Sequence, residues 1–432
     1  MNVARKYIFV LGVLYILFFL FTSSAIAEGL EGKIYYVSQK GNNNHLGTKE
    51  KPWKTIQHAA NNMESGDTVF VRGGIYSEFV RITKSGSKAD GDITFQAFAG
   101  EVPILDGKKI KLSSANRAFF FIEDASYIRI EGFELRNLKT RDADLYPAGI
   151  LVKGGSNHIT LSNNNIHHIE NNSKKGNAHG ILFYGNSPHA MSNITINNNE
   201  IHHLKLGNSE ALTLSGNVKE FSITHNKVHH NNNIGIDIAG HYKACEVAGC
   251  IDQARNGTIS NNTVFQNSSK RNVAYKEYSA AGIYADGSTQ LTIENNIVSQ
   301  NDFGIELASE NGKKATSTID VISNIIHSNK GAGIITGGAE QTNGGAIGNK
   351  IANNILLFND QSKEGYGEIV MQWNTKENQI LNNMIYSKEK DEFIQHNSEN
   401  AIDNVYMNNT IYSFEEKPSF FTRVKDFFNN LR

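Results

Sequence analysis

Short apolar strands separated by polar turns recur along most of the chain. One repeating unit joins two such strands through a shared Asn, as in ITLSNNNIHHI at 159–169 and LTIENNIVSQN at 291–301. A third strand lies between successive units, as in GIDIAG at 235–240 and GIYADG at 282–287. Three strands per repeat, each too short to bury its own apolar face, are satisfied by stacking on the next repeat. The pattern predicts an all-β, single-domain right-handed parallel β-helix over residues 67–415.

The shared Asn is a second regular feature, because Asn tolerates left-handed backbone and stacked amides can bond along the helix axis. It falls at Asn164, Asn198, Asn226, Asn262, Asn296, Asn324, Asn354, Asn383 and Asn409. Three tandem pairs follow this bend in successive units, namely His167-His168, His202-His203 and His229-His230. Two interpretations of the pairs are open: a metal-binding histidine ladder, or stacked structural imidazoles.

Helical spacing is confined to the two ends of the repeat region. The segment KPWKTIQHAANNM at 51–63 predicts a helix that, with a first strand, forms an N-terminal cap over 28–66. The tail at 416–432 places its Phe residues, with Val424 and Leu431, on one helical face, which predicts a C-terminal amphipathic cap. Docking of that tail on a membrane surface is the alternative.

The first residues have the layout of a secretory signal. Arg5 and Lys6 precede an apolar run that is shorter than the ~20 residues needed to span a bilayer, and small residues end at Ala27. We therefore expect cleavage of 1–27 and a secreted, extracellular, monomeric protein without a membrane span. The net charge of −1 becomes −1 − 2 = −3 without Arg5 and Lys6, so no basic field favours nucleic acid. In a secreted chain, Cys245 and Cys250 predict a disulfide.

Alternation sends two columns of side chains outward from the third strand of each unit. The first column reads Leu151, Leu182, Thr213, Asp237, Tyr284, Glu306, Ile335 and Val370, and the second reads Lys153, Tyr184, Ser215, Ala239, Asp286, Ala308, Gly337 and Gln372. The acidic members are confined to the middle units. With ~4.8 Å between stacked strands, Asp237 and Glu306 lie about 9.6 Å apart and Asp286 roughly 8 Å from each. That spacing suits a divalent cation or an acid/base pair.

Residues around these strands extend the candidate site. Glu210 and His179 fall one position before their strands, and two long inserts, at 241–256 and 267–280, would wall a cleft on the same face. The inserts bring to this cleft His241, Tyr242, Lys243, Asp252, Arg255, Lys276, Glu277 and Tyr278. The alternative is that the acids only make a solvent-exposed face soluble.

The opening segment YYVSQKGNNNHLGTKEKPWKTIQHAANNMESGDTVFVRGGIYSE resembles the start of secreted bacterial β-helix proteins, among them pectate and alginate-type polysaccharide lyases. The segment from 233 to 310 is similar to bacterial right-handed β-helix repeat proteins. These resemblances imply the fold and do not specify a substrate. The partner that we expect, an extracellular polysaccharide, belongs to the enzyme hypotheses given next. Family-nine pectate lyases hold calcium on clustered aspartates and use a lysine base. Here Asp237 and Asp286 stand as single acids on their strands, so the aspartate-rich calcium signature of those lyases is not found. We therefore do not infer pectate specificity, and we assign no lysine of this sequence the role of their catalytic base.

Three functions follow as hypotheses. In a lyase acting on a uronate-containing polysaccharide, Asp237, Asp286 and Glu306 bind Ca²⁺, which neutralises the uronate carboxylate and acidifies its α-proton. That proton is removed by Lys243, Arg255, His241 or a tyrosine. In an inverting glycoside hydrolase the same carboxylates, with Glu210 beside them, act directly. The fold analogy favours the lyase, and the lack of a base on the central strands favours the hydrolase. A non-catalytic glycan-binding or cell-surface protein would instead stack sugars on tyrosines. The candidate substrate contacts are Tyr184, Tyr284, His179, Tyr242 and Tyr278.

Overall fold

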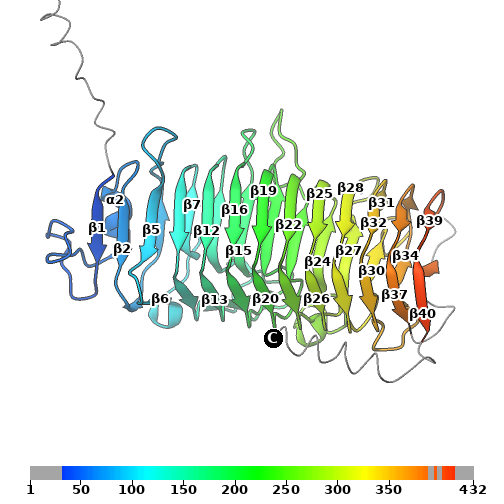
Figure 1. The fold of residues 1–432 in the computed structure, drawn as a ribbon. Helices are drawn as coiled ribbons and strands as arrows, with labels where there is room; N and C mark the ends of the chain where they lie inside the picture. Colours follow the sequence, from blue (N-terminus) through cyan, green and yellow to red (C-terminus); the bar gives the residue numbers. More distant parts are fainter. Residues whose placement is uncertain (1–31, 388–393, 397–400, 414–432) are drawn as a thin grey trace, which may run out of the picture.

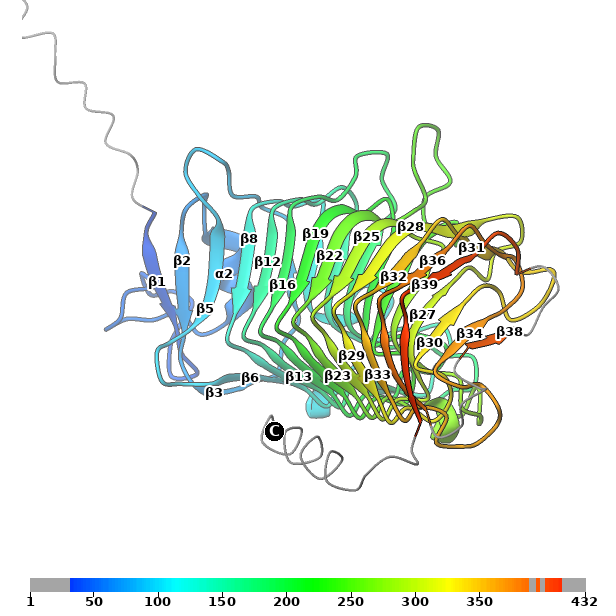
Figure 2. The same ribbon diagram turned by 45° about the vertical axis from the view of Figure 1, so that its right-hand side comes forward.

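The computed structural model describes residues 32–387, 394–396 and 401–413, and in them the chain winds into a right-handed parallel β-helix (Figure 1). Most coils contribute one strand to each of three long sheets, which we call sheets A, B and C. The coils stack along one axis from the N-terminal to the C-terminal end (Figure 2). The predicted fold class is therefore confirmed. The signal segment predicted at 1–27 and the helix predicted at 416–432 lie outside the described residues.

Sheet A has 15 strands. They are β1 (Ile34–Val37), β2 (Thr68–Val71), β5 (Ile93–Ala97), β8 (Ile128–Glu131), β12 (Ile159–Ser162), β16 (Ile194–Asn197), β19 (Lys219–Thr224), β22 (Arg255–Ser260), β25 (Thr289–Glu294), β28 (Ala315–Ile322), β31 (Gly345–Ile347), β32 (Lys350–Ala352), β35 (Thr375–Lys376), β36 (Gln379–Leu381) and β39 (Val405–Met407).

Sheet B has 12 strands. They are β3 (Gly74–Tyr76), β6 (Pro103–Asp106), β9 (Glu134–Arg136), β13 (Asn165–His167), β17 (Glu200–His202), β20 (Lys227–His229), β23 (Thr263–Phe265), β26 (Ile297–Ser299), β29 (Ile325–His327), β33 (Ile355–Leu357), β37 (Met384–Ser387) and β40 (Thr410–Ser413).

Sheet C, which carries the candidate site, has 11 strands. They are β4 (Val80–Ile82), β7 (Ala118–Glu123), β11 (Ala148–Lys153), β15 (His179–Gly185), β18 (Leu212–Gly216), β21 (Ile236–Ala239), β24 (Ala281–Asp286), β27 (Phe303–Ala308), β30 (Ile334–Thr336), β34 (Ile369–Met371) and β38 (Ile394–His396). A separate pair joins β10 (Lys139–Thr140) to β14 (Glu170–Asn171).

Helical structure is sparse in the described residues. The helix α2 (Ile56–Asn62) lies in the segment that the sequence predicts to be helical, and its Ile56 joins the core of the first coils. Thr55 caps it, and the carboxylate of Glu78 accepts hydrogen bonds from the first free backbone N–H groups. Two 3₁₀ turns complete the list, η1 (Gly107–Lys109) and η2 (Ser269–Arg271). None of the helices in this part of the chain has the length and apolar character of a membrane span.

The interior is one continuous apolar core built by alternation along each strand. In β21, Ile236 and Ile238 point inward and are fully buried, while Asp237 and Ala239 point to the outer face. Neighbouring strands run parallel and in register, so that Ile236 pairs with Ile283 of the next coil. Because each coil repeats this pattern, side chains of one column lie above one another along the whole axis.

A ladder of buried amides forms the bend between sheets A and B. In Asn262, the backbone N–H and the side-chain amide both donate to Oδ1 of Asn296, at 2.9 and 3.0 Å, and the amide also donates to Ile223 O. The predicted ladder is confirmed except at one member, which is Asn199 instead of Asn198. Asn198 is the residue before it, whose φ of 54° makes the left-handed bend. Three successive Asn residues left the register ambiguous by one position.

A second amide ladder, which was not predicted from the sequence, lies at the bend between sheets B and C. Its members are Asn231, Asn267, Asn301, Asn329 and Asn359, each donating to the next. The last amide donates to the carboxylate of Glu368. The two ladders fix the A–B and B–C bends of the middle coils with buried hydrogen bonds.

Candidate functional site

The two predicted outward columns exist on sheet C. Pairing in register confirms the whole first column, from Leu151 to Val370. The second column is confirmed from Lys153 to Ala308. Asp237 and Asp286 therefore sit on adjacent strands of one face, offset by two positions.

A pocket of about 560 Å³ opens on this face of sheet C, beneath loops that connect it to the other sheets. Its floor comes from β11, β15, β18, β21 and β24, and its walls from the loops at 141–147, 172–178, 203–211, 240–254, 266–280 and 309–314. It is lined by Tyr146, Lys153, Asn177, His179, Leu182, Tyr184, Asn208, Ser209, Glu210, Thr213, Ser215, Ile234, Asp237, Ala239, Tyr242, Tyr275, Tyr284, Asp286 and Glu310. Tyrosines and carboxyl groups thus dominate the chemistry of the lining.

Asp237 lies on the pocket floor and is only 4% exposed, because the loops cover a face that alternation alone would leave in water. Its Oδ1 atom is buried and has no hydrogen-bond partner among the described residues. Burial raises the pKa of this carboxyl well above its usual value, and the charges of Glu210 and Asp286 raise it further. An unpartnered carboxyl at this depth costs free energy unless something else uses it.

Asp286 is equally buried but has partners. The hydroxyl of Tyr242 donates to Oδ2, and the backbone N–H of Glu310 donates to Oδ1 at 3.3 Å. Burial and the charge of Glu310 raise the pKa of Asp286, whereas these two donors act in the opposite direction. The carboxylate form of Asp286 therefore has support that Asp237 lacks.

A short polar chain lines the pocket beside these acids. Nδ1 of His179 lies 3.1 Å from the hydroxyl of Thr213, which donates to Oε2 of Glu210 at 3.0 Å. Burial raises the pKa of Glu210 to about 7 and lowers that of His179 to about 4. Because the Thr213 hydroxyl donates its hydrogen bond to Glu210, its oxygen accepts one from Nδ1–H of His179. Nε2 of His179 is therefore the unprotonated nitrogen.

Glu306 occupies the predicted column but does not line the pocket. It pairs in register with Tyr284, whose ring is buried on the pocket floor. Burial raises the pKa of Glu306 to about 8, and the charge of Glu310 adds to this effect. Its influence on the pocket is therefore electrostatic, through Asp237 and Asp286.

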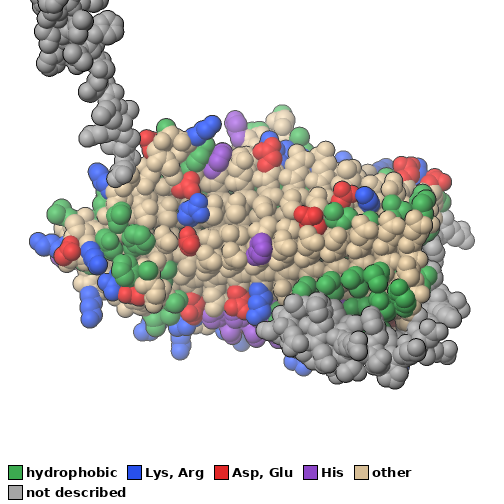
Figure 3. All heavy atoms as spheres, viewed as in Figure 1, with side chains coloured by type: hydrophobic (Ala, Val, Ile, Leu, Met, Phe, Trp, Pro, Cys, Tyr) green, Lys and Arg blue, Asp and Glu red, His purple; other side chains and the backbone are tan. Residues whose placement is uncertain are grey.

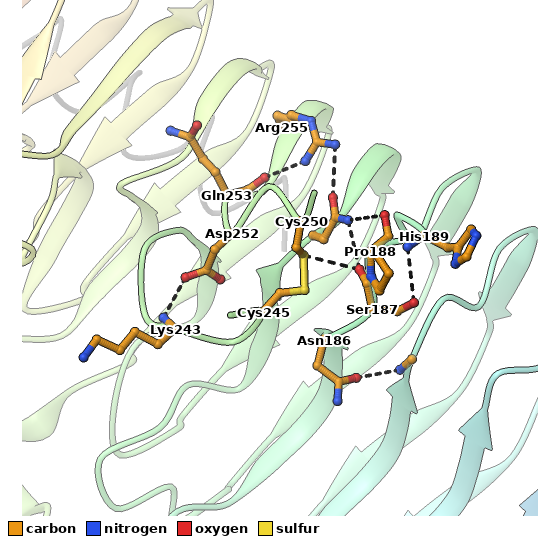
Figure 4. Close-up of a disulfide and its surroundings, with 12 residues drawn as sticks. Asn186, Ser187, Pro188, His189, Lys243, Cys245, Cys250, Asp252, Gln253 and Arg255 are labelled. Carbon is orange, nitrogen blue, oxygen red and sulfur yellow. Dashed lines mark hydrogen bonds between the residues drawn. A yellow bond between two sulfur atoms is a disulfide. The ribbon is translucent and has the colours of Figure 1, made fainter. Parts of the chain in front are cut away.

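Several residues that the sequence predicts to reach the cleft lie elsewhere. Arg255 begins β22 in sheet A, where it donates to Gln253 O and to Oδ1 of Asn217 (Figure 4). Lys243 is exposed and only its backbone N–H contacts Asp252 (Figure 4). The remaining predicted residues outside the lining are His241, Asp252, Lys276, Glu277 and Tyr278. Alternation does not extend into loops, so the sequence could not tell which residue of each insert points inward.

The structure adds residues to the site that the sequence did not single out. Tyr146 and Tyr275 come from loops of different coils, and Glu310 follows β27. Tyr275 lies in the insert that the sequence predicts to be a wall, three residues before the predicted Tyr278, which does not line the pocket. The predicted disulfide between Cys245 and Cys250 is formed, and Cys250 Sγ lies 3.3 Å from Ser187 O of an earlier coil (Figure 4). The disulfide closes a short loop within the insert that carries Tyr242.

The three residues predicted to bind calcium lie on one face of sheet C. In the parts of the chain that the structure describes, no three or more His, Cys, Asp and Glu side chains are placed to hold one metal ion together. Asp237, Asp286 and Glu306 share a face without converging on one point. Calcium stays a prediction from the sequence, and no chemical step below depends on it.

Comparison with known proteins places the chain in a family. A model described as "Right handed beta helix region" matches residues 148–356, and one described as "Pel9A-like, right handed beta helix region" matches 35–203. The uncharacterized protein YwoF of Bacillus subtilis is 37% identical over 396 residues, which cover 90% of this chain and 83% of YwoF. The chain belongs to the β-helix family of YwoF.

One further relative and one solved structure of the same fold carry named activities. The pectate lyase PEL9 of Emericella nidulans is 32% identical over 144 residues, covering 30% of this chain and 33% of PEL9. The GH136 lacto-N-biosidase of Eubacterium ramulus shares the fold, with a TM-score of 0.65 over 88% of this chain and 68% of that protein, at 16% identity. The Pel9A-like match ends at residue 203, before Glu210, Asp237 and Asp286. It therefore covers one side of the pocket but not its acids.

Proposed function

We propose that this protein is a secreted glycoside hydrolase that binds its glycan in the tyrosine-walled pocket of sheet C and cleaves it with Asp237 and Asp286. The observation that carries the proposal is the buried, unpartnered carboxyl of Asp237 on the floor of an open pocket. The likeness to a pectate lyase, and the fold shared with a lacto-N-biosidase, support a carbohydrate as the substrate class.

The environments of the two acids divide the roles. Asp237 has no donor to stabilise its ionised form, so it keeps its proton and serves as the general acid that protonates the leaving oxygen. Asp286 accepts from Tyr242 and Glu310, so it loses its proton first and serves as the general base toward water. Two carboxyls whose surroundings separate their proton affinities are what acid/base catalysis requires.

The register supports inversion of configuration. Asp286 pairs with Ala239, two residues beyond Asp237 on the neighbouring strand, so the two backbones are about 8 Å apart. If the two outward side chains keep this spacing at their carboxyl groups, they fall within the roughly 6.5–9.5 Å by which inverting enzymes leave room for the attacking water, and outside the about 5–5.5 Å of retaining enzymes. We therefore expect the product to carry the opposite anomeric configuration to the substrate.

Neighbouring groups complete the site. The rings of Tyr146, Tyr184 and Tyr275 offer apolar faces with a polar edge, which suits contact with sugar rings. Glu210, with a pKa of about 7, and Nε2 of His179 supply further groups for binding hydroxyls beside Asp237. Tyr242 stays a neutral donor, because burial and Asp286 raise its pKa.

A lyase remains the second candidate, since the Pel9A-like match includes the pocket residues Lys153 and Tyr184. Removal of a proton beside a uronate carboxylate calls for a cation to stabilise the developing charge. Lys153 is the one cationic side chain lining the described pocket, and it lies three strands from Ala239. The acid-rich lining therefore favours hydrolysis of a bond next to a neutral sugar.

The test is a screen of oligosaccharides and polysaccharides, with reducing-end release and ultraviolet absorbance of unsaturated products measured in parallel. We expect reducing ends without unsaturated products, and a loss of about 10²–10⁴-fold in kcat/KM for Asp237→Asn and for Asp286→Asn. Asp320→Asn, an exposed acid on the outer face of sheet A, is the matched control and should retain full activity. Unsaturated products would refute hydrolysis, and binding without turnover that survives Asp237→Asn would indicate a glycan-binding protein.

A further inference from the structure

Six histidines form a double row outside the pocket. His167, His202 and His229 end the consecutive strands β13, β17 and β20, and His168, His203 and His230 follow them. The rings of the first row stack at 4.9 and 5.1 Å, and those of the second at 5.7 and 4.9 Å. Figure 3 shows histidine side chains gathered along the lower edge of the molecule, in the region of these strands.

The bend itself does not require histidine. His203 and His230 both have a φ of 54°, and the equivalent residues of the two coils after His230, Gln266 and Gln300, have values of 55° and 58°. The first row likewise continues as Phe265 and Ser299. Since Gln forms the same left-handed turn, the fold alone does not account for three consecutive His pairs.

Each pair brings two ring nitrogens together. The two Nδ1 atoms lie 2.7 Å apart in the first pair, 2.6 Å in the second and 2.7 Å in the third. Neutral imidazoles at this distance share one proton, so one Nδ1 of each pair donates and the other accepts with its lone pair. The second-row rings His203 and His230 are exposed. A solute can therefore reach the nitrogen pairs from water.

Outer contacts fix which nitrogen is free. Nε2 of His167 lies 3.3 Å from Glu134 Oε1, Nε2 of His202 lies 3.0 Å from Asn165 Oδ1, and Nε2 of His229 lies 3.0 Å from Glu200 Oε1. An oxygen acceptor at Nε2 holds the proton there and directs the lone pair of Nδ1 at the partner ring. Metal-bound histidines are oriented by this kind of second contact.

The charge state suits ligation. His229 is buried and His167, His168 and His202 are half-buried, which disfavours the imidazolium form of these rings. The ammonium of Lys227 is paired with Glu200 at 3.0 Å. Neutral imidazole is the form that binds transition metals.

We propose that each His pair is a two-nitrogen chelating site for one transition metal ion, so that the face carries three such sites in a row. Metal–nitrogen bonds of ~2.0–2.1 Å in tetrahedral geometry set the nitrogens about 3.3 Å apart, a small opening from the present pairs. The proton of the second ring moves from Nδ1 to its own Nε2, so that no proton is lost. Water fills the other coordination positions.

The chemistry of the donors ranks the ions. Two imidazoles favour Cu²⁺ over Zn²⁺ and Ni²⁺, and they do not select Ca²⁺ or Mg²⁺, which prefer oxygen. Dications on adjacent rungs would lie about 5 Å apart and repel each other. The outer pairs, His167-His168 and His229-His230, therefore fill first, and the middle pair fills more weakly.

Titration of the full chain with Cu²⁺, by calorimetry and by electron paramagnetic resonance, tests the proposal without reference to activity. We expect two tight ions with nitrogen hyperfine structure and a third, weaker one. His203→Gln should remove only the weak phase. His168→Gln combined with His203→Gln and His230→Gln should abolish binding.

Controls keep the result interpretable. Gln occupies the second-row position in the next two coils, so the Gln variants should fold, which their thermal unfolding checks. His158→Gln, at a left-handed position in another sheet, should leave the two tight ions in place. Absence of tight Cu²⁺ binding, equal binding of Ca²⁺, or unchanged stoichiometry in the triple variant would overturn the proposal.

Discussion

The unpartnered carboxyl of Asp237 makes a quantitative prediction about stability. Because its pKa is raised in the folded protein, Asp237 keeps its proton at pH values where the unfolded chain, with a usual Asp pKa of about 3.9, has lost it. Over that range the unfolded state binds one proton fewer, so the free energy of unfolding falls by about 1.4 kcal/mol per pH unit as pH rises. This group therefore stabilises the fold at low pH and loses that contribution as pH rises through its folded pKa.

Asp237→Asn removes this titration while keeping the shape of the side chain. The unpartnered amide has its own cost, but that cost does not change with pH. We expect the free energy of unfolding of the variant to gain on that of the wild type by up to about 2.7 kcal/mol between pH 5 and pH 7. Taking the difference between two proteins cancels the opposite trend from His179 and His202, whose pKa values are lowered.

Denaturant unfolding followed by circular dichroism at pH 5, 6 and 7 measures this difference. Asp320→Asn, with its exposed carboxyl, should track the wild type at every pH. A difference between Asp237→Asn and wild type that stays constant across this range would refute the reasoning. It would mean that Asp237 is ionised in the folded protein and has a partner there.

Three further outcomes follow from the same contacts. Tyr242→Phe removes a donor from the Asp286 carboxylate, so the acidic limb of the pH–rate profile should move upward by about one unit. Tyr184→Ala should raise KM about tenfold with little change in kcat, measured on the substrate found in the screen. Asn262→Ala breaks the first amide ladder and should lower the free energy of unfolding by about 2–4 kcal/mol in denaturant titrations. The exposed Asn62→Ala should change it by less than about 0.5 kcal/mol.

Much of the scaffold could be predicted because its period is strict. A two-residue alternation decides which side of the coil a residue faces, and it correctly placed Asp237, Tyr284 and Asp286 on one surface. The shared Asn fixed the register of most coils. It failed only at Asn198, where three Asn residues in a row offered three equivalent alignments.

The walls of the pocket could not be predicted in the same way. Whether Asp237 is exposed to solvent or buried depends on how the loops at 240–254 and 266–280 fold over sheet C. Loops have no repeating pattern of inward and outward positions from which this could be predicted. Tyr242 and Tyr275 turn inward while Lys243 and Tyr278 do not, although all four stand in the same inserts. The second amide ladder, by contrast, does have a sequence signal, because each of its members stands five residues after an Asn of the first ladder, as Asn267 follows Asn262.

The ladder from Asn231 to Asn359 has a direction along the axis. In each amide one side-chain N–H donates toward the C-terminal coils, the second donates back to a backbone carbonyl of the preceding coil, and the amide carbonyl points toward the N-terminal coils. The five carbonyl dipoles therefore align along the axis. The row therefore presents partial positive charge at Asn359, where the carboxylate of Glu368 receives both the side-chain and the backbone N–H. The carboxylate of Glu368 stabilises the positive end of this row in the way that acidic residues stabilise the positive N-terminal end of an α-helix. Replacing Glu368 with the neutral Gln would leave that end of the row without its counter-charge.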